Sequence, residues 1–443
     1  MTIQEAKNQQ EWDSFLAQGP FRPFLQSWTM GEVYRDTNQE PIRLEVRDEG
    51  RIVAICQAIL VPAKRGRHLM IPYGPVINFQ LSTFNFQLTL DSLIQELTKI
   101  ARAHQCSFIR MSPFLPAVAP QGAKEGWPPT GSKPSPLHLL AEYLWYLPLV
   151  QPDPWSFSFD FTSIPRPLPP REEGENATRQ SNNHKHTHSP SPVERGLGGE
   201  VELQKEGPGV RSIPHTEEEL LMAMRKTTRN LIRRAERDGV TVEASRDPNR
   251  EIEHFIALHE ETRQRHGFTP YTNTFFRSQV RRFAERGECT LYLARFQGEV
   301  AAASIHMHVF GETSYHHGAS THRLSKIPAS YLLQWTAIRD ALKRGDHVYN
   351  FWGIAPMQQE SSEGAGLAGP APGGHNIGKG WSVEGKPLGL PSTNRHPFAG
   401  VTLFKTGFGG SLLPLTHCMD FPLSARYYLT RAFELVRKWK RGF

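Results

Sequence analysis

The sequence predicts a mixed α/β fold of the α+β kind, built as two domains, and three observations lead to this prediction. The chain has 443 residues, which is more than one ordinary domain holds. Strand-like and helix-like patterns are intermixed along the chain rather than segregated. Two long segments that are rich in Pro, Gly and polar residues, 161–215 and 357–397, interrupt the patterned parts.

The first domain is predicted over residues 1–160. Leu44–Arg47 and Ile52–Leu60 have the composition of strands and are joined by a Glu49-Gly50 turn. Asp91–His104 carries one apolar stripe and is predicted as a helix that Asp91 caps. A buried strand follows at Ser107–Met111. The alternation of strand, helix and strand indicates an α/β or α+β domain.

Residues 161–215 contain few side chains that can build a core, so a disordered linker is predicted there. Residues 357–397 have a similar composition and are predicted as a long surface loop inserted into the second domain.

The second domain is predicted over residues 216–443. It opens with a capping box from Thr216 to Glu219 and a helix that Gly239 ends. A strand, two helices, three antiparallel strands, a helix and a strand follow in the pattern of residues 240–354. This order is that of acetyltransferase-like (GNAT) folds.

Composition excludes several classes of protein. The four cysteines (Cys56, Cys106, Cys289 and Cys418) lie far apart, so neither a disulfide scaffold nor a zinc ribbon is predicted. No run of 18 apolar residues and no secretory leader is visible, which predicts a soluble protein of a reducing compartment. The net charge of +7 favours anionic partners if the basic residues are clustered.

One such cluster is the predicted helix after Thr216. Lys226, Arg229, Arg233 and Arg237 share one face of this helix, which suits the phosphates of a nucleotide or an RNA. A solvated helix face explains the same spacing equally well, and both interpretations stay open.

A second candidate is Phe404-Lys405, which a glycine-rich turn follows. A lysine placed there can stabilise negative charge that develops during acyl transfer. The plainer interpretation is a surface lysine on a strand. His306 and His308 share a strand face without a carboxylate or cysteine nearby, so packing or hydrogen bonding is expected and no metal site is predicted.

The turn before the helix at Ser330 bears on the choice of acyl donor. A CoA-dependent acetyltransferase has a glycine-rich loop here, whose N–H groups bind a pyrophosphate. Arg323–Ser330 has no glycine, and Pro328 removes a donor. A CoA donor is therefore disfavoured.

The C-terminal stretch Arg426–Arg441 is predicted as a basic amphipathic helix. It is suited to an anionic membrane surface. Packing on its own domain is the favoured interpretation.

A set of ordered sequence blocks carries a family resemblance. In the second domain they are 226–240 (KTTRNLIRRAERDGV), 261–268 (ETRQRHGF), 315–320 (YHHGAS), 331–335 (YLLQW), 349–354 (YNFWGI) and 403–410 (LFKTGFGG); in the first domain, 24–28 (FLQSW) and 71–76 (IPYGPV) match more weakly. With these blocks the chain resembles the Fem (FemABX) family of aminoacyl-tRNA-dependent peptidyltransferases, which build interpeptide bridges of peptidoglycan. The resemblance covers most of the chain outside the two low-complexity segments.

The resemblance implies two acetyltransferase-like subdomains in tandem. It implies aminoacyl-tRNA as the donor and co-substrate, no cofactor, and an amine of a lipid-linked or nucleotide-linked peptidoglycan precursor as the acceptor. A cytoplasmic location follows, with peripheral contact at the inner face of the membrane left open.

The resemblance also assigns roles to residues. Lys405, with Phe404 beside it, would serve the acyl-transfer centre near the tRNA 3′ end. Arg265 would contact the phosphates of the precursor, and Tyr315 would contact the same precursor. Two positions depart from the family pattern: a lysine of some members is replaced by Tyr34, and an aspartate by Asn350. The basic residues Lys226, Arg229 and Arg233 would attract tRNA or precursor phosphate.

Two alternatives remain at this point. One is an acyl-CoA-dependent N-acyltransferase on the same fold, which acetyl-CoA binding would reveal. The other is a non-catalytic protein that binds tRNA or assists wall assembly and transfers nothing.

Overall fold

The computed structural model describes residues 1–63, 66–78, 81, 83–117, 128–137, 140–155, 213–266, 271–356 and 398–441, and gives only the backbone of residues 83, 84, 265, 266 and 441. The linker predicted at 161–215, apart from its last three residues, and the loop predicted at 357–397 lie outside the described residues. The two described sheets belong to one compact unit of the chain.

The first sheet has eight strands in the order β1-β2-β3-β4-β6-β17-β7, and β5 pairs with β3. The strands are β1 (Thr2–Glu5), β2 (Pro41–Asp48), β3 (Arg51–Val61), β4 (His68–Pro72), β5 (Val76–Ile77), β6 (Phe108–Ser112), β7 (Lys133–Pro134) and β17 (Met419–Pro422). Only β4 and β6 pair in parallel among these strands. Glu49 and Gly50 join β2 to β3 with φ of 49° and 80°, which is the backbone of the tight hairpin turn that the sequence predicts.

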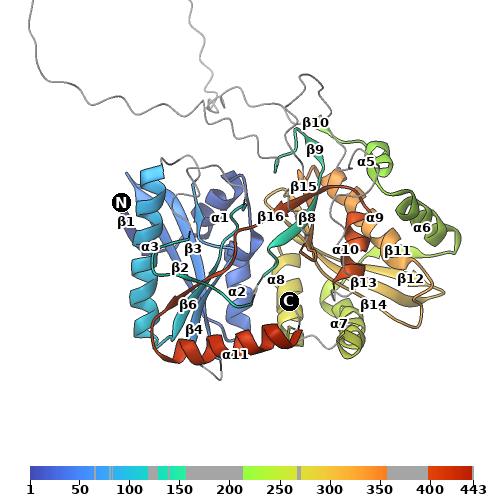
Figure 1. Cartoon of the computed structure of the whole chain (residues 1–443). Helices are drawn as coiled ribbons and strands as arrows, with labels where there is room; N and C mark the ends of the chain where they lie inside the picture. The colour runs from blue at the N-terminus through green and yellow to red at the C-terminus, as the bar shows by residue number, and fades with distance from the viewer. Residues whose placement is uncertain are drawn as a thin grey trace, which may run out of the picture. The chain divides into compact units, whose positions relative to one another are not determined.

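Helices cover both faces of the first sheet (Figure 1). Helix α3 (Thr83–Ala103) packs Leu90, Leu93 and Leu97 against the strands. It begins eight residues before Asp91, so the predicted cap at Asp91 is wrong. The apolar stripe extends through Phe86 and continues the helix toward the N-terminus. On the other face lie α1 (Gln9–Gln18), the 3₁₀ turn η1 (Phe24–Gln26) and α2 (Trp28–Asp36).

The second sheet has seven strands in the order β11-β12-β13-β14-β15-β8-β16. They are β8 (Tyr143–Pro148), β11 (Thr241–Ala244), β12 (Cys289–Phe296), β13 (Glu299–Val309), β14 (Glu312–Ser320), β15 (Val348–Gly353) and β16 (Ser411–Pro414). β14 and β15 are parallel, with α9 (Ala329–Arg344) as the connection between them. A separate pair joins β9 (Val150–Gln151) to β10 (Ile213–Pro214).

The second sheet lies between two helical layers, as Figure 1 shows. One core cluster joins the strands to α9, α5 (Glu217–Ala223), α6 (Lys226–Arg237) and the end of α10 (Ala399–Thr406). The other joins them to α7 (Pro248–His266) and α8 (Asn273–Ala284). This arrangement confirms the predicted order of helices and strands.

The helix predicted from Thr216 to Gly239 is two helices. Its ends are as predicted, because Thr216 and Glu219 form the capping box and Gly239 has φ of +84°. Between α5 and α6 the backbone is extended at Met224, with ψ of 152°. The Arg225 N–H donates to the Gly407 carbonyl at 2.9 Å instead of to its own helix. A tertiary contact therefore separates two helices where the local sequence pattern predicts a single one.

The two sheets exchange strands, so they do not follow the predicted boundaries at 160 and 216. β8 comes from the first part of the chain but pairs with β15 and β16 in the second sheet. β17 comes from the end of the chain but pairs with β6 in the first sheet. The Arg110 guanidinium of β6 binds the buried Asp420 carboxylate of β17 at 2.7 and 2.9 Å. Pairing between distant segments of the chain decides to which sheet β8 and β17 belong, and the composition of a strand does not predict such pairing.

The C-terminal helix α11 (Arg426–Arg441) forms where the sequence predicts it. Within the described ranges, no helix is both long and apolar enough to span a bilayer.

Candidate functional site

Lys405 lies in the last turn of α10, and its side chain is buried with 7% of its surface exposed. Its Nζ donates a hydrogen bond to the Gly353 carbonyl at 2.7 Å. The interpretation as a surface lysine on a strand is wrong, because the glycines at 407, 409 and 410 follow a helix and bring its last turn against the second sheet.

Burial lowers the pKa of the Lys405 amine to about 7. Removal from water is the only cause of this shift, and no carboxylate among the described residues forms an ion pair with the amine. The group is therefore present in both its charged and its neutral form near neutral pH.

Tyr315 of β14 faces the same lysine, although the two residues are ninety positions apart. The Lys405 Nζ lies 5.6 Å from the centre of the Tyr315 ring. A Cβ placed on Gly318 would lie only 1.8 Å from the Tyr315 hydroxyl oxygen, so the glycine makes room for that hydroxyl. Burial raises the pKa of Tyr315 to about 12, which keeps the hydroxyl protonated as a hydrogen-bond donor.

A buried polar chain fixes the other side of the Tyr315 ring, which stacks on His306 with ring centres 5.4 Å apart. The Tyr349 hydroxyl donates to Gln334 Oε1 at 2.6 Å and lies 2.7 Å from His306 Nε2. Because that hydroxyl has one proton, His306 Nε2–H is the donor to its oxygen. Burial holds the pKa of His306 well below its ordinary value, so the ring is neutral. His306 thus has the hydrogen-bonding role that the sequence predicts.

The carbonyl that receives the Lys405 hydrogen bond stands on an irregular strand end. The pairing of β15 with β8 is interrupted between Asn350 and Gly353, and Trp352 has φ of +67°. The Trp352 N–H donates to Asn350 Oδ1 at 2.8 Å. An amide oxygen accepts this bond as a carboxylate oxygen does, so Asn350 shapes the strand end without an acidic group.

Phe404 is half-buried and holds α10 against α9. Its ring lies 4.9 Å from the Tyr331 ring and 5.4 Å from the Phe408 ring, centre to centre. Phe404 therefore fixes the helix that carries Lys405, and its contacts are those of a packing residue.

The three residues of α6 that were expected to attract phosphate differ from one another. Lys226 and Arg233 are exposed. The Arg229 guanidinium instead donates to the carbonyls of Leu221 and Met222 at 3.2 Å each and to that of Met224, at the end of α5. Only part of the predicted basic face is thus directed to solvent.

Arg225 is a residue that sequence reasoning missed. Its guanidinium donates to Thr406 Oγ1 at 2.7 Å and to the Leu403 carbonyl, which ties α6 to α10 beside Lys405. The sequence offered one sign of its role: Arg225 directly precedes the block 226–240 that carries the family resemblance.

The structure describes the side chain of Tyr34 but not that of Arg265. Arg265 lies near the end of α7, and its side chain is outside the described residues. Tyr34, at the position of the family's lysine, is buried in an apolar cluster, and burial raises the pKa of its phenol. Tyr34 therefore replaces a cation with a core side chain.

The turn before α9 uses several of its own N–H groups. Those of Ser325 and Ile327 donate to the carbonyls of His322 and Leu324 at 3.0 and 2.9 Å. The Tyr331 N–H, in the first turn of α9, donates to the Pro328 carbonyl at 3.1 Å. Donors that are occupied in this way are not free for a pyrophosphate, which agrees with the missing glycine.

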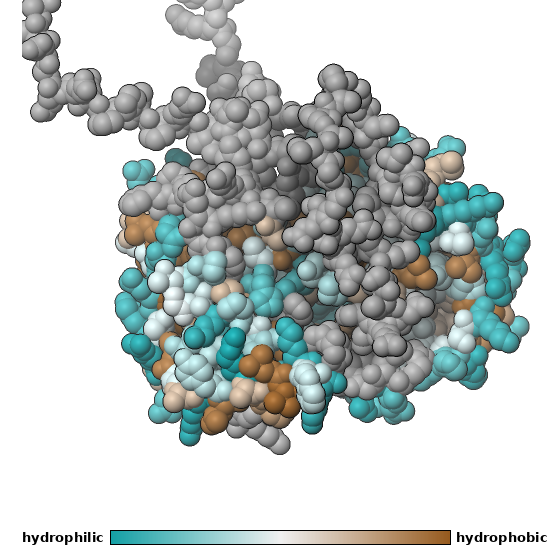
Figure 2. All heavy atoms as spheres, in the orientation of Figure 1, coloured by the Kyte–Doolittle hydropathy of each residue, from teal (hydrophilic) through white to brown (hydrophobic). Residues whose placement is uncertain are grey.

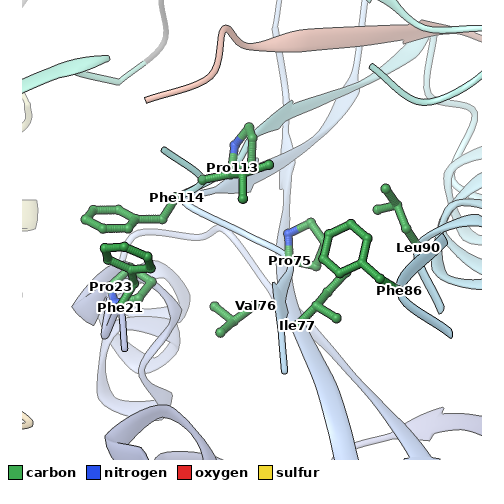
Figure 3. Close-up of a pocket in the computed structure, with 10 residues that line it drawn as sticks. Phe21, Pro23, Pro75, Val76, Ile77, Phe86, Leu90, Pro113 and Phe114 are labelled. Carbon is green, nitrogen blue, oxygen red and sulfur yellow. The ribbon is translucent and has the colours of Figure 1, made fainter. Parts of the chain in front are cut away.

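A pocket in the first domain has an apolar lining from β5, α3 and the segment after β6, with Phe21, Val76, Phe86 and Phe114 among its walls (Figure 3). It presents no titratable side chain, so acid–base chemistry is not assigned to it. Across the described ranges, no three His, Cys, Asp or Glu residues come together as metal ligands.

Comparison with known proteins yields two family models and several solved structures. The FemAB family model matches residues 8–125, and the acetyltransferase (GNAT) domain model matches residues 222–358. The crystal structure of FemX is 15% identical, with a TM-score of 0.64 over 98% of this chain and 100% of that chain. No curated protein matches the sequence.

Two further structures resemble the chain less closely. A tandem GNAT protein from the clavulanic acid biosynthesis pathway is 10% identical, with a TM-score of 0.46 over 95% of this chain and 97% of that one. The C-terminal domain of a putative lysylphosphatidylglycerol synthetase from Agrobacterium fabrum is 14% identical, with a TM-score of 0.45 over 91% and 90%.

The likeness to FemX confirms the fold of two acetyltransferase-like domains in tandem. The FemAB match covers the first domain, and the acetyltransferase match covers most of the second. On these grounds the chain resembles the FemAB family over most of its first domain and acetyltransferase (GNAT) domains over most of its second.

Proposed function

We propose that this protein is an aminoacyltransferase of interpeptide bridge synthesis. It moves an amino acid from aminoacyl-tRNA to the stem-peptide amine of a peptidoglycan precursor. The match to the FemAB family model and the match to the acetyltransferase domain model support an acyl-transferring enzyme of peptidoglycan bridge formation. The tRNA donor, the acceptor and the roles of individual residues are part of this proposal.

The observation that carries the proposal is the meeting of Lys405 and Tyr315. The family resemblance assigns both residues to the reaction, and the fold brings the Lys405 amine 5.6 Å from the Tyr315 ring centre. An amine that is buried without a counter-ion costs stability, and such groups are concentrated at functional sites.

The chemistry needs little more than positioning and charge stabilisation, because the aminoacyl ester is already activated. The acceptor amine attacks the ester carbonyl, a C–N bond forms, the ester C–O bond breaks, and a proton from the amine ends on the leaving ribose hydroxyl. The charged form of Lys405 stabilises the oxyanion, a contribution of about a hundredfold to a thousandfold in rate for one well-placed donor. Tyr315 orients the acceptor through its protonated hydroxyl. No cofactor besides the co-substrate is required.

The donor tRNA is held electrostatically in this proposal. Lys226 and Arg233 are exposed at α6, and α6 is tied through Arg225 to the helix that carries Lys405. Both cations are available for tRNA phosphates, with Arg229 supporting them from the α5 end. Arg265 contacts the phosphates of the precursor. Because both substrates are made inside the cell, the protein acts on the cytoplasmic side of the membrane.

A transfer assay with the full-length protein tests this function. A pool of radiolabelled aminoacyl-tRNAs is incubated with the protein and with lipid-linked or nucleotide-linked precursor, and label on the precursor is measured. Transfer that depends on the protein is expected, and it also identifies the amino acid. Acetyl-CoA binding with no transfer from tRNA would instead establish an acyl-CoA enzyme. Binding of tRNA whether or not it is aminoacylated, with neither activity, would establish a non-catalytic protein.

A further inference from the structure

The C-terminal helix α11 is attached to the first sheet through its polar side. The Glu434 carboxylate accepts from the Arg110 guanidinium at 2.8 and 3.0 Å. The Arg431 guanidinium donates to the Pro134 carbonyl at 2.7 Å, and the Tyr427 hydroxyl donates to the buried Asp420 at 3.2 Å. Besides the buried Tyr427 ring, which packs on Phe108 with ring centres 5.4 Å apart, the contacts that orient the helix are hydrogen bonds and ion pairs.

The opposite side of α11 is apolar and faces solvent. Leu429 is 71% exposed and Trp439 is 81% exposed. The other exposed large apolar residues of the helix are Tyr428, Phe433, Leu435 and Val436. Figure 2 shows hydrophobic side chains gathered along the lower edge of the molecule, where Figure 1 places α11. This is the reverse of an ordinary surface helix, which turns its apolar stripe to the core.

The charges of α11 indicate what covers this apolar side. The helix has six basic residues, Arg426, Arg431, Arg437, Lys438, Lys440 and Arg441, and Glu434 is its one acidic residue. Glu434 is paired with Arg110 of the sheet. Arg426, Lys438 and Lys440 are exposed, and Arg426 and Lys440 flank the apolar side at the spacing of the helix.

We propose that α11 docks on an anionic lipid bilayer, with its axis in the plane of the surface. The apolar side chains enter the boundary between headgroups and acyl chains, the aromatic rings of Tyr428 and Trp439 lie at the headgroup level, and the lysines and arginines meet lipid phosphates. A second copy of the chain fits less well, because pairing two of these helices would bring like charges together. This inference is independent of the proposed catalytic function.

The test is co-sedimentation of the full-length protein with vesicles. Vesicles of phosphatidylcholine mixed with phosphatidylglycerol are compared with vesicles of phosphatidylcholine alone, at low and high salt. Binding to the anionic vesicles is expected, weakened by salt and at least about tenfold stronger than binding to the neutral ones. The double variant Leu429→Ser/Trp439→Ser is expected to bind about tenfold more weakly, and so is Arg426→Glu/Lys440→Glu.

A matched control tests whether the loss of vesicle binding is specific to the apolar side of α11. Met222 of α5 is 68% exposed and remote in sequence from α11, so Met222→Ser removes an equally exposed apolar side chain without changing vesicle binding. Thermal unfolding checks that each variant is folded, which is expected because the substituted side chains are exposed.

Three outcomes would overturn the proposal: full-length protein that stays in the supernatant with anionic vesicles at low salt, equal binding to neutral and anionic vesicles, or unchanged binding of both folded double variants. Self-association that the serine variant abolishes, without vesicle binding, would assign the apolar side to a second copy instead.

Discussion

At the scale of single residues, the environment of Lys405 is unfavourable to the charged form of a lysine. The amine is buried and its one polar contact in the described structure is a neutral carbonyl. Its pKa is lowered to about 7 in the folded protein, against an ordinary value of 10.5. The folded state therefore binds fewer protons than the unfolded state between these two pH values.

This shift predicts a pH-dependent stability. Because the unfolded state binds more protons, the Lys405 contribution to the free energy of unfolding rises as pH increases from about 7 to about 10. In Lys405→Met this contribution is absent. Urea unfolding of both proteins at about pH 6 and at about pH 9 is expected to show the wild type gaining relative to the variant at the higher pH. A difference that does not change with pH would mean that the amine is not desolvated.

A second prediction at this scale separates Arg229 from Arg233. Arg229→Ala removes donors from the end of α5, so a loss of about 1–2 kcal/mol in the free energy of unfolding is expected. Arg233→Ala leaves stability unchanged because the side chain is exposed, but it weakens tRNA binding about threefold to tenfold and makes that binding less dependent on salt. Chemical denaturation and filter binding at several salt concentrations measure the two effects. Weaker tRNA binding without loss of stability in Arg229→Ala, together with loss of stability in Arg233→Ala, would refute these roles.

The residues of the candidate site could be selected from the sequence, but their geometry could not. The motif around Lys405 and the block around Tyr315 were recognisable separately, because each is contiguous. Burial of the lysine, its bond to Gly353 and the αL backbone of Trp352 depend on residues from distant elements. Period and composition do not report such contacts.

At the scale of elements, local signals located most helices and strands. The capping box at Thr216, the turn at Glu49-Gly50 and the αL glycines at 239 and 345 each act through neighbouring residues, so they were readable. The break between α5 and α6 was not, because the Gly407 carbonyl that binds the Arg225 N–H comes from another helix.

The glycines around α10 give a prediction at this scale. In Gly410→Ala the new Cβ would lie 2.1 Å from the Tyr146 carbonyl oxygen, at a φ of +97° that alanine rarely adopts. A loss of about 3 kcal/mol or more in the free energy of unfolding is expected. Gly400 is also close to Lys405 but has open space around it, so Gly400→Ala is expected to be neutral or to stabilise α10 by up to about 1 kcal/mol. Equal effects of the two substitutions in urea unfolding would contradict this account.

At the scale of the whole molecule, a helix that packs on the first sheet, α2, contacts a helix that packs on the second, α8, and this contact joins the domains. Asp36 at the end of α2 accepts from Ser278, Arg281 and Arg282 of α8. These hydrogen bonds, that of Arg282 first, hold the pKa of the Asp36 carboxyl well below its usual range. The exchange of β8 and β17 between the sheets couples the domains further. Neither feature was visible in the sequence, since both depend on pairing across hundreds of residues.

The Asp36 cluster gives the prediction at this scale. Asp36→Asn is expected to lower the free energy of unfolding by about 1–2 kcal/mol near neutral pH, since Arg281 and Arg282 lose their partly exposed charged partner. Because the folded pKa is depressed, the loss shrinks as pH falls below about 4. Glu40→Gln breaks a more exposed pair with Arg35 and is expected to cost under about 0.5 kcal/mol. A penalty for Asp36→Asn that persists unchanged in acid would contradict the ionic interpretation.

In the proposed function, Lys405 serves aminoacyl transfer from tRNA to a peptidoglycan precursor. The most direct measurement is the single-turnover rate of Lys405→Met in the transfer assay, beside Lys326→Met, which removes an exposed lysine of the same domain. We expect the Lys405 variant to be folded and slowed about a hundredfold or more, with Lys326→Met unchanged. A folded Lys405→Met protein that transfers the amino acid at the wild-type rate would contradict the account.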